Sequence, residues 1–585
     1  MQESGAEIIH QRLMKAGIKA VFLVPGAQVD PLSMELAKSP QLTTVIANHE
    51  LAAGFMADGY ARASHKVGVC VGIGACGAAN MLPAAATAAA DDSAVLFLTG
   101  NIASSMNGYG AFQDAGPGGS DDSAIFRQFV RYSALPESTE ALRYELDRIF
   151  NLISQPLRAP AHLSIPYDVQ NQTSDGESLA GNWHVLPKGL DPDAEAGLKK
   201  IADALAISER PLLLVGPRFM SPDAHCVLRQ FAETYCVPVA TTLSAKGILP
   251  EIHALSLGNF GFGGSRRAQE AILRGNADTV LLLGADFNER DSLSWDSRIK
   301  SDGRQIMRVD SKCVDSLGIE VDSQVTSDSV AAVRHWLTCS DSRLGPLLKS
   351  APERSSWTDS LLKTPHIYGA EVDSSCPDGT LPLDLVVQTL RENVPDDTIL
   401  VVDAGLHRIF AGHYWKTKQP GTFFSACATV PMGWAVCASI GIQIARSDQP
   451  VVVLTGDGCM RAQGLELATM VRYRLPIVTI VCNNGAYGSV FRRVQHSPCG
   501  EDLTVLPPVD WVRFATALGA RAHRIDNKTK LRDSLISIFD ESCNTSKAER
   551  GPFLLDVATP LHQKIPHPEL LCSSLANSAS LSGRL

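Results

Sequence analysis

Residues 451–458 read VVVLTGDG, and residues 477–484 read IVTIVCNN. Each stretch is a short apolar run that ends in polar residues, a pattern typical of a strand buried on both faces of a parallel sheet. Because the carboxyl ends of parallel strands lie at one edge of a sheet, Asp457 and Asn484 are expected to lie close together. The two stretches therefore predict an α/β fold with a polar site at that edge.

The polar residues at these two strand ends suit a divalent cation that holds a diphosphate. One carboxylate, one carboxamide and a backbone carbonyl give Mg²⁺ oxygen ligands without excess negative charge. Gly456 and Gly458, on either side of Asp457, let backbone N–H groups come close to phosphate oxygens. A Gly-Asp-Gly sequence alone is more often an ordinary turn, so the prediction depends on the paired strands and on Asn483-Asn484 together.

The same alternation of apolar runs and helical patterns recurs along the chain and predicts an α/β protein of three doubly wound parallel-sheet domains. The first domain is predicted at 1–180, the central domain at 190–340 and the third domain at 381–560. An irregular linker is expected at 341–380, and a loose tail is expected at 561–585. Three domains agree with the chain length of 585 residues.

In the first domain, the apolar run TVIAN at 44–48 leads to Glu50 and then to a helical pattern. The apolar residues around Glu50 favour a hydrogen bond in which the carboxyl group shares its proton. The simpler interpretation is a first-turn glutamate that interacts with the helix dipole. The residues alone favour this simpler interpretation.

The Gly-Asp-Gly and Asn-Asn spacing resembles the diphosphate-binding motif of thiamine diphosphate enzymes. The string HELAAGFMADGYAR at 49–62 resembles the glutamate motif of the acetolactate synthase (acetohydroxyacid synthase large subunit) branch of the 2-oxo acid decarboxylase superfamily. This resemblance implies that the first domain binds the pyrimidine and the third domain binds the diphosphate of thiamine diphosphate. It also implies that Glu50 activates the cofactor, and that Asp457, Asn484 and the carbonyl of Ala486 bind Mg²⁺.

Further site residues follow from the same resemblance. Phe112 and Gln113 resemble a Phe-Gln pair beside the thiazolium of acetolactate synthases, where pyruvate-type decarboxylases carry two histidines, and this favours the carboligase branch. His407 resembles a phosphate-contacting residue, and Met432 matches the apolar residue that supports the bent cofactor. The implied catalytic residues are Glu50, Phe112 and Gln113. The implied cofactor-binding residues are Glu50, Asn80, Gly405, His407, Met432, Gly456, Asp457, Gly458, Asn484, Ala486 and Gly488.

Several positions depart from the pattern of the family. The turn GACGAAN at 74–80 replaces the family's Ser-Gly-Pro-Gly-Ala-Thr-Asn, and the loop at 114–123 is enlarged. Arg493 stands where acetolactate synthases place a tryptophan that selects the acceptor. An inward-pointing arginine favours an anionic or polar acceptor, while a solvated surface arginine fits the position equally well.

Flavin binding is left open by the sequence. Acetolactate synthases hold FAD in the central domain without using its redox chemistry, and the segments 241–250, 258–264 and 288–290 resemble their flavin-contacting regions. Against this, the turn LLLVGPR at 212–218 has one glycine where the flavin site usually has several. The three alternatives are FAD, another nucleotide and an empty domain.

The resemblance implies a carboligase that decarboxylates a 2-oxo acid and adds the remaining acyl carbon to a second carbonyl compound. A non-ligating 2-oxo acid decarboxylase and a diketone-cleaving lyase or hydrolase are alternatives on the same cofactor, and a non-catalytic homologue is a third class. A remote alternative is an NAD-dependent dehydrogenase, because Gly72, Gly74 and Gly77 spell the dinucleotide fingerprint and Asp91 and Asp92 follow about twenty residues later. These aspartates, however, precede a predicted strand, whereas the fingerprint needs its acid at a strand end.

Composition and charge limit the partners and the location. The net charge of −10 is spread without acidic blocks, which argues against nucleic acid, and the 14 cysteines lack a Cys-x-x-Cys pair, as is typical of a reducing compartment. The uncharged stretch 67–90 is rich in Gly and Ala, so a strand, turn and helix are expected there instead of a membrane span. A cytoplasmic location is expected, although the C-terminal Ser-Gly-Arg-Leu distantly resembles a peroxisomal signal. The family resemblance implies a homodimer or homotetramer with its site at a subunit interface.

Overall fold

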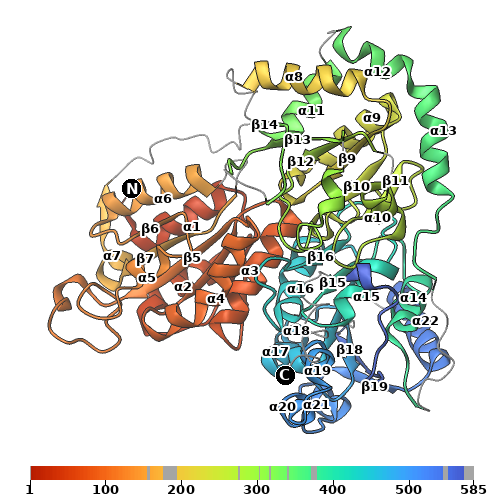
Figure 1. Ribbon diagram of the computed structural model, residues 1–585. Helices are drawn as coiled ribbons and strands as arrows, with labels where there is room; N and C mark the ends of the chain where they lie inside the picture. The colour runs from red at the N-terminus through yellow and green to blue at the C-terminus, as the bar shows by residue number, and fades with distance from the viewer. Residues whose placement is uncertain are drawn as a thin grey trace.

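The computed structural model describes residues 2–153, 158–175, 194–274, 277–301, 303–314, 318–338, 342–369, 379–544 and 551–571. Within these residues the chain forms three α/β domains, each built on a six-stranded sheet. Figure 1 shows the first domain on one side, with the central and third domains stacked beside it. This architecture confirms the predicted fold class.

The first domain has the strand order β3-β2-β4-β5-β7-β6, and all of its neighbouring strands are parallel. The strands are β2 (Ala20–Leu23), β3 (Thr43–Ile46), β4 (Gly68–Gly72), β5 (Val95–Asn101), β6 (Tyr132–Ala134) and β7 (Ala161–Pro166). The helices are α1 (Gly5–Lys15), α2 (Asp30–Lys38), α3 (Glu50–Ser64), α4 (Cys76–Ala90), α5 (Asp122–Phe126), α6 (Thr139–Ile153) and α7 (Tyr167–Asn171). The stretch 67–90 forms β4, a turn and α4, as predicted. A short antiparallel pair of β1 (Gln2–Ser4) and β8 (Thr173–Asp175) joins the two ends of the domain.

The central domain has the strand order β11-β10-β9-β12-β13-β14, again with parallel neighbours. The strands are β9 (Pro211–Val215), β10 (Val239–Thr241), β11 (Ser256–Asn259), β12 (Thr279–Leu283), β13 (Gln305–Asp310) and β14 (Ser323–Thr326). The helices are α8 (Ala194–Ile207), α9 (Ala224–Tyr235), α10 (Arg266–Leu273) and α11 (Ser329–Thr338). In sequence order this is the 3-2-1-4-5-6 arrangement of dinucleotide-binding folds, with its switch point between β9 and β12.

The third domain has the strand order β16-β15-β17-β18-β20-β19, also parallel throughout. The strands are β15 (Ile399–Val402), β16 (Phe423–Ser425), β17 (Val451–Gly456), β18 (Ile477–Asn483), β19 (Arg521–Ile525) and β20 (Phe553–Ala558). The helices are α14 (Leu383–Glu392), α15 (His407–Tyr414), α16 (Trp434–Ala445), α17 (Asp457–Gln463), α18 (Leu467–Arg472), α19 (Gly488–Val494), α20 (Gly500–Thr504), α21 (Trp511–Ala517) and α22 (Lys528–Asn544). The first and third domains share one strand order, which matches their predicted common role in holding the two ends of one cofactor.

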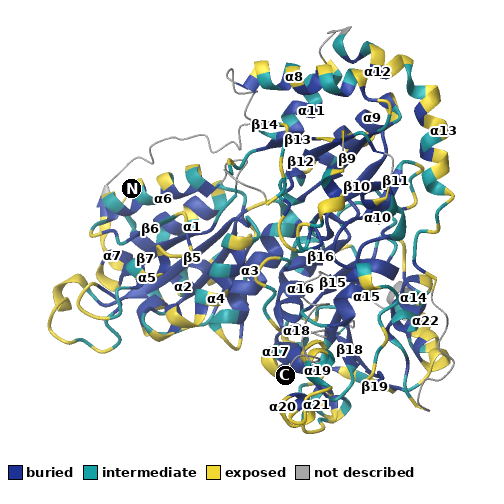
Figure 2. Ribbon diagram, in the orientation of Figure 1, coloured by how far each residue is buried: buried dark blue, intermediate teal, exposed yellow. Residues whose placement is uncertain are grey.

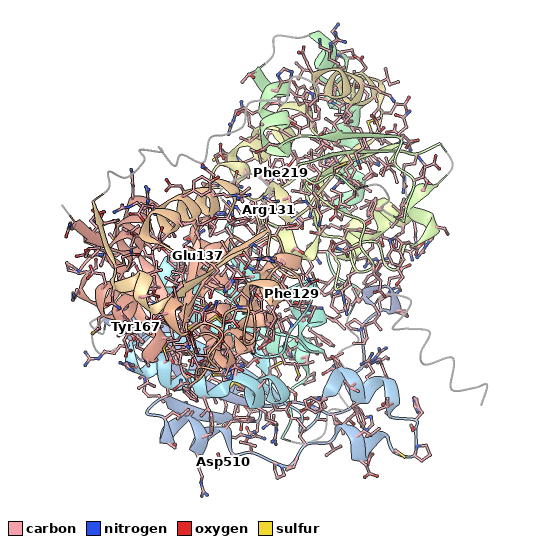
Figure 3. All side chains as sticks on the ribbon, turned by 90° about the vertical axis from the view of Figure 1, so that its left-hand side faces the viewer. Phe129, Arg131, Glu137, Tyr167, Phe219 and Asp510 are labelled. Carbon is pink, nitrogen blue, oxygen red and sulfur yellow. The ribbon has the colours of Figure 1, made fainter. Side chains whose placement is uncertain are left out.

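The first and third domains pack together through α3 and α16, which lie side by side in Figure 1. A single apolar core runs from Phe22 and Phe55 of the first domain to Trp434 and Val453 of the third. This continuous core, dark blue in Figure 2, fixes the two domains relative to each other. In the view of Figure 3 the first domain faces the viewer, with Phe219 of the central domain above it.

The segment predicted as an irregular linker at 341–380 contains two helices, α12 (Gly345–Lys349) and α13 (Ala351–Leu362). Leu347 is buried in the core of the central domain, and the buried Arg354 guanidinium donates hydrogen bonds to the carbonyl of Tyr235. These helices therefore cover the central domain, and the prediction of an irregular linker is wrong for this part. Helix α13 has no clear apolar stripe in its sequence, and such a stripe is the main signal from which a helix is predicted.

The first part of the segment predicted as a loose tail, 561–585, packs against the folded domains. Leu570 and Leu571 are buried in the core of the third domain, and Glu569 accepts hydrogen bonds from Arg274 and Tyr368. The C-terminal Ser-Gly-Arg-Leu and the polar passage predicted between the first two domains lie outside the described residues. In the part of the chain that the structure describes, no helix has the length and apolar character needed to cross a membrane.

Candidate active site

The two strand ends that decide the fold meet at one edge of the third sheet. Strands β17 and β18 are neighbours, with Gly456 paired to Cys482. Helix α17 begins at Asp457, directly after β17, and Asn484 directly follows β18. The side chain of Asn483 turns away from this edge and donates a hydrogen bond to Asp556 Oδ1 (3.0 Å), so it supports the strand end.

A pocket of about 300 Å³ opens at this edge. It brings together many of the residues that the sequence singles out in the third domain. They are Gly405, His407, Met432, Gly456, Asp457, Gly458, Asn484, Ala486, Gly488 and Arg493. Its volume lies at the lower end of the range for sites that bind small molecules or cofactors.

Asp457 is the acidic residue of this pocket, and it is buried. Its Oδ1 accepts a hydrogen bond from the N–H of Gly458 (2.9 Å), while its buried Oδ2 has no hydrogen-bond partner among the described residues. Burial raises the pKa of Asp457 to about 6, and the backbone N–H groups of Gly458, Gly485 and Ala486 oppose that shift. A buried carboxylate oxygen without a partner is costly, and a cation bound to it would remove that cost. The site therefore fits a hard divalent cation.

His407 is the second buried polar group of the pocket. Burial, with the nearby Arg408 charge, lowers the pKa of His407 to about 3, so the imidazole is neutral near pH 7. Its Nε2 is buried and has no hydrogen-bond partner among the described residues. The ring lies directly against Gly405, whose φ of +149° and lack of a side chain allow this approach. A neutral imidazole in this place can donate one hydrogen bond to a phosphate oxygen.

Asp403 connects three segments that line this pocket. It lies at the end of β15, where the resemblance to thiamine diphosphate enzymes places the start of the diphosphate-side loop that includes Gly405. Its Oδ1 accepts hydrogen bonds from the N–H groups of Ala404 (2.9 Å) and Gly433 (3.0 Å), and its Oδ2 accepts one from Thr455 Oγ1 (3.0 Å). Burial raises the pKa of Asp403 to about 6. Asp403 thus fixes the turns that carry His407 and Met432.

The glutamate of the first domain lies in a separate half of the candidate site. Glu50 is the first residue of α3, and its Oε2 accepts a hydrogen bond from Asn80 Nδ2 (3.0 Å). Its Oε1 lies against Gly77, where an added Cβ would come within 3.2 Å, and Gly72 leaves room for its Cγ in the same way. The glycines of the sequence fingerprint therefore make room for a carboxylate, and they give no support to a dinucleotide site.

Phe112 and Gln113 lie on the exposed loop after β5, which is largely yellow in Figure 2. The Phe112 side chain is 85% exposed, and Gln113 Nε2 contacts Cys76 Sγ at 3.6 Å. Neither residue lines the pocket of the third domain, and the same is true of Glu50 and Asn80. One chain thus presents two separate groups of predicted site residues, one from each outer domain.

Comparisons with known proteins agree with this division of the chain. The family model "Thiamine pyrophosphate enzyme, N-terminal TPP binding domain" matches residues 3–123, the model of the central domain matches 198–333, and the model of the C-terminal TPP binding domain matches 403–557. Together the three models match most of the chain.

Relatives that are similar over nearly the full length carry acetolactate synthase names. The chain is 27% identical to the "Probable acetolactate synthase large subunit" of Methanocaldococcus jannaschii, over 96% of this chain and 93% of that relative. It is 26% identical to the acetolactate synthase isozyme 1 large subunit of Escherichia coli, over 96% of this chain and 95% of that protein.

A solved structure shares the fold. It comes from Mycobacterium smegmatis and is named for thiamin diphosphate dependence, with a TM-score of 0.76 and 22% identity over 96% of this chain and all of that one. The three-sheet architecture, the paired strand ends with their polar pocket and the three matching domain models agree with one another. The chain is a member of the thiamine pyrophosphate enzyme family, and it is an enzyme that depends on this cofactor.

Proposed function

We propose that this enzyme is a carboligase of acetolactate synthase type that requires Mg²⁺ as well as thiamine diphosphate. The observation that carries the metal assignment is the buried, unpartnered Oδ2 of Asp457 in a pocket that Asn484 and Ala486 also line. Asp457 Oδ2, the side-chain oxygen of Asn484 and the carbonyl of Ala486 would be the protein ligands of the ion. Among the described residues, no group of three or more His, Cys, Asp or Glu side chains is placed to hold a metal ion.

When bound, thiamine diphosphate supplies an electron sink for the decarboxylation of a 2-oxo acid and for the addition of the acyl carbon to a second carbonyl. The residues of the chain then have distinct tasks. His407 would face the diphosphate through Nε2, and Met432, which is 45% exposed on the pocket wall, would support the rings. Glycines 458 and 488 let the backbone approach the diphosphate and the metal.

Glu50 would act on the pyrimidine ring of the cofactor. Because Oε2 accepts the hydrogen bond of Asn80, Oε1 is the oxygen that would share a proton with the pyrimidine nitrogen. Residues of the first domain do not line the pocket of the third domain, which supports a site that combines this pocket with Glu50 of a second copy of the chain. A homodimer or homotetramer with its site between subunits therefore follows from the proposal.

Carboligation is favoured over simple decarboxylation by the names of the full-length relatives and by Phe112 and Gln113 on the first-domain loop. Arg493 lines the pocket and is exposed, which supports an anionic or polar acceptor. The alternatives on the same cofactor are a non-ligating 2-oxo acid decarboxylase and a diketone-cleaving lyase or hydrolase.

The direct test is to incubate the purified protein with thiamine diphosphate, Mg²⁺ and a panel of 2-oxo acids, with and without aldehydes. Mass spectrometry of the products should find a new carbon–carbon bond in a hydroxyketone or hydroxy acid product, and omission of Mg²⁺ should abolish it. Aldehyde as the only product would favour the decarboxylase. Activity that is unchanged in the absence of divalent cations would contradict the metal assignment.

A further inference from the structure

The central domain has a strand order at which many α/β proteins bind a dinucleotide. Strands β9 and β12 are neighbours at its switch point, and ligands of such sheets bind in the crevice beyond these strand ends. The family resemblance raises FAD as the ligand. Whether the crevice of this chain fits a flavin dinucleotide can be judged from the residues that follow β9, β12 and β13.

We propose that this crevice is closed by an ion-pair network, that the central domain binds no flavin dinucleotide, and that the network instead fixes the central domain to the first domain. The network consists of Asp92, Arg218, Asp286, Arg308 and Asp310. The proposed carboligation does not use this network. The proposal about the network is therefore independent of the proposed function.

Arg218 is the centre of the network and lies in the turn after β9, three residues beyond Val215. Its Nε and Nη2 donate to the two carboxylate oxygens of Asp310 (2.7 and 2.8 Å), and Nη2 also lies 2.5 Å from Asp286 Oδ1. Its Nη1 donates to Asp92 Oδ2 (2.8 Å) in the first domain. The side chain thus spans the strand ends from β9 past β12 to β13, beside the switch point.

Arg308, on strand β13, is the second arginine of the network. Its Nη2 lies 2.9 Å from both Asp286 Oδ1 and Asp310 Oδ2, and the side chains of Arg308 and Asp310 are fully buried. The two guanidinium groups are therefore already matched by three carboxylates. Neither of the two guanidinium groups of the network is therefore free to bind a diphosphate.

The backbone of the turn after β9 is also occupied. The N–H of Gly216 donates to the carbonyl of Leu283 (2.9 Å), and the N–H of Arg218 donates to the carbonyl of Gly284 (3.1 Å). Between them, Pro217 has no N–H to offer. A dinucleotide site needs the N–H groups of this turn for the diphosphate, and here they bind the neighbouring strand end instead.

The cavity that includes Asp92 and Arg218 of the network is small. A cavity of about 100 Å³ lies at the junction of the three domains, where Asp92, Arg218 and Phe423 form parts of its wall. Cofactor sites usually have volumes of about 300 Å³ or more. The cavity has room for a few water molecules and is too small for a flavin dinucleotide.

The same two aspartates that resembled a nucleotide signature join the first domain to the rest of the chain. Asp91 pairs with Arg62 Nη2 (2.9 Å) and accepts hydrogen bonds from the N–H groups of Cys427 (3.2 Å) and Ala428 (3.0 Å) of the third domain. Asp92 pairs with Arg218 of the central domain. Two consecutive residues thus connect the first domain to both of the others.

The flavin part of the proposal is tested on the wild-type enzyme. The protein, purified with added riboflavin in the growth medium, should contain no stoichiometric flavin, and titration with FAD should give no saturable quenching of flavin fluorescence. Saturable binding of thiamine diphosphate by the same sample serves as the control for correct folding. One flavin per chain, or saturable FAD binding by the wild-type enzyme, would overturn the proposal.

The linking role is tested with Asp92→Asn, Arg218→Lys and the double variant. Each single change should lower the midpoint of thermal unfolding, and the double variant should fall no further than the more affected single variant, because both changes break the same contact. Arg229→Lys is the matched control, since this exposed arginine of α9 pairs only within its own helix and should leave the midpoint unchanged. Additive shifts for Asp92→Asn and Arg218→Lys would show that the two residues do not act together and would overturn the linking role.

Discussion

Asp457 is the residue on which the metal assignment depends. Asp457→Ala removes the carboxylate proposed to bind Mg²⁺. The Mg²⁺-dependent binding of thiamine diphosphate should therefore weaken by at least about 10- to 100-fold. Isothermal titration calorimetry with and without Mg²⁺ measures this directly. Asp510→Asn is the control, because the exposed Asp510 (Figure 3) caps α21 and does not line the pocket. Unchanged cofactor affinity in Asp457→Ala would contradict the assignment.

Glu50 is expected to act on the chemistry and not on binding. Glu50→Gln keeps the shape of the side chain and its contact with Asn80 but cannot share a proton. Turnover should fall by about 10²- to 10⁴-fold while thiamine diphosphate affinity stays within a fewfold of wild type. NMR measurement of C2 proton exchange on the bound cofactor checks the step itself. Glu137→Gln, an exposed glutamate of the same domain (Figure 3), should behave as wild type.

Asp403 should give the protein a pH-dependent stability. Its folded pKa of about 6 lies above the ordinary value of 3.8, so this carboxyl stabilises the fold below about pH 4 and loses that contribution as the pH rises through 6. Asp403→Asn keeps the shape and removes the titration. Between pH 4 and pH 7 the free energy of unfolding of the variant should therefore rise, relative to wild type, by on the order of 1–3 kcal/mol. Urea unfolding across this pH range tests it, and a pH-independent difference would contradict it.

At the scale of elements, the contact between α3 and α16 depends on two glycines. A Cβ at Gly441 would overlap the carbonyl oxygen of Met56, and a Cβ at Gly59 would overlap that of Ala438. Gly441→Ala should therefore destabilise the protein by about 1–3 kcal/mol in spite of the higher helix propensity of alanine. Chemical unfolding measures the effect. Gly345→Ala, at a helix start with no neighbouring atom within 4 Å, is the matched control and should be neutral or slightly stabilising.

The sequence predicted the inner strands well and the edge strands poorly. Inner strands such as β12 and β17 are buried on both faces, so they read as unbroken apolar runs. Strands β14 and β19 lie at sheet edges, and their side chains are alternately buried or mostly exposed. Without an apolar run or a regular alternation, these elements are specified by pairing with their neighbours, which local sequence does not show.

At the scale of the whole molecule, the third-domain half of the site was predictable because strand ends of one sheet meet at one edge. His407, Asp457 and Asn484 follow three different strands, yet they line one pocket. The network around Arg218 was not predictable, because its five residues come from four separate segments in two domains. In the sequence these five residues resemble ordinary surface charges, and only the folded structure brings them into contact.

The separation of Glu50 from the Asp457 pocket within one chain leads to a prediction about assembly. If each site combines Glu50 of one copy with Asp457 of another, Glu50→Gln and Asp457→Ala should each be inactive alone. A mixed dimer would contain one site with both native residues and one site with both changes. Random pairing of equal amounts of co-expressed chains should therefore restore about a quarter of wild-type activity.

The control is to mix the two variants after separate purification, under conditions in which subunits do not exchange, where activity should stay absent. Differently tagged chains allow the mixed dimers to be isolated by two affinity steps, and the activity per mixed dimer should then be about half that of the wild-type dimer, because one of its two sites is intact. Full activity loss in isolated mixed dimers would place Glu50 and Asp457 of the same chain in one site. In that case the first and third domains would have to change their relative position, and the continuous core between α3 and α16 would have to open.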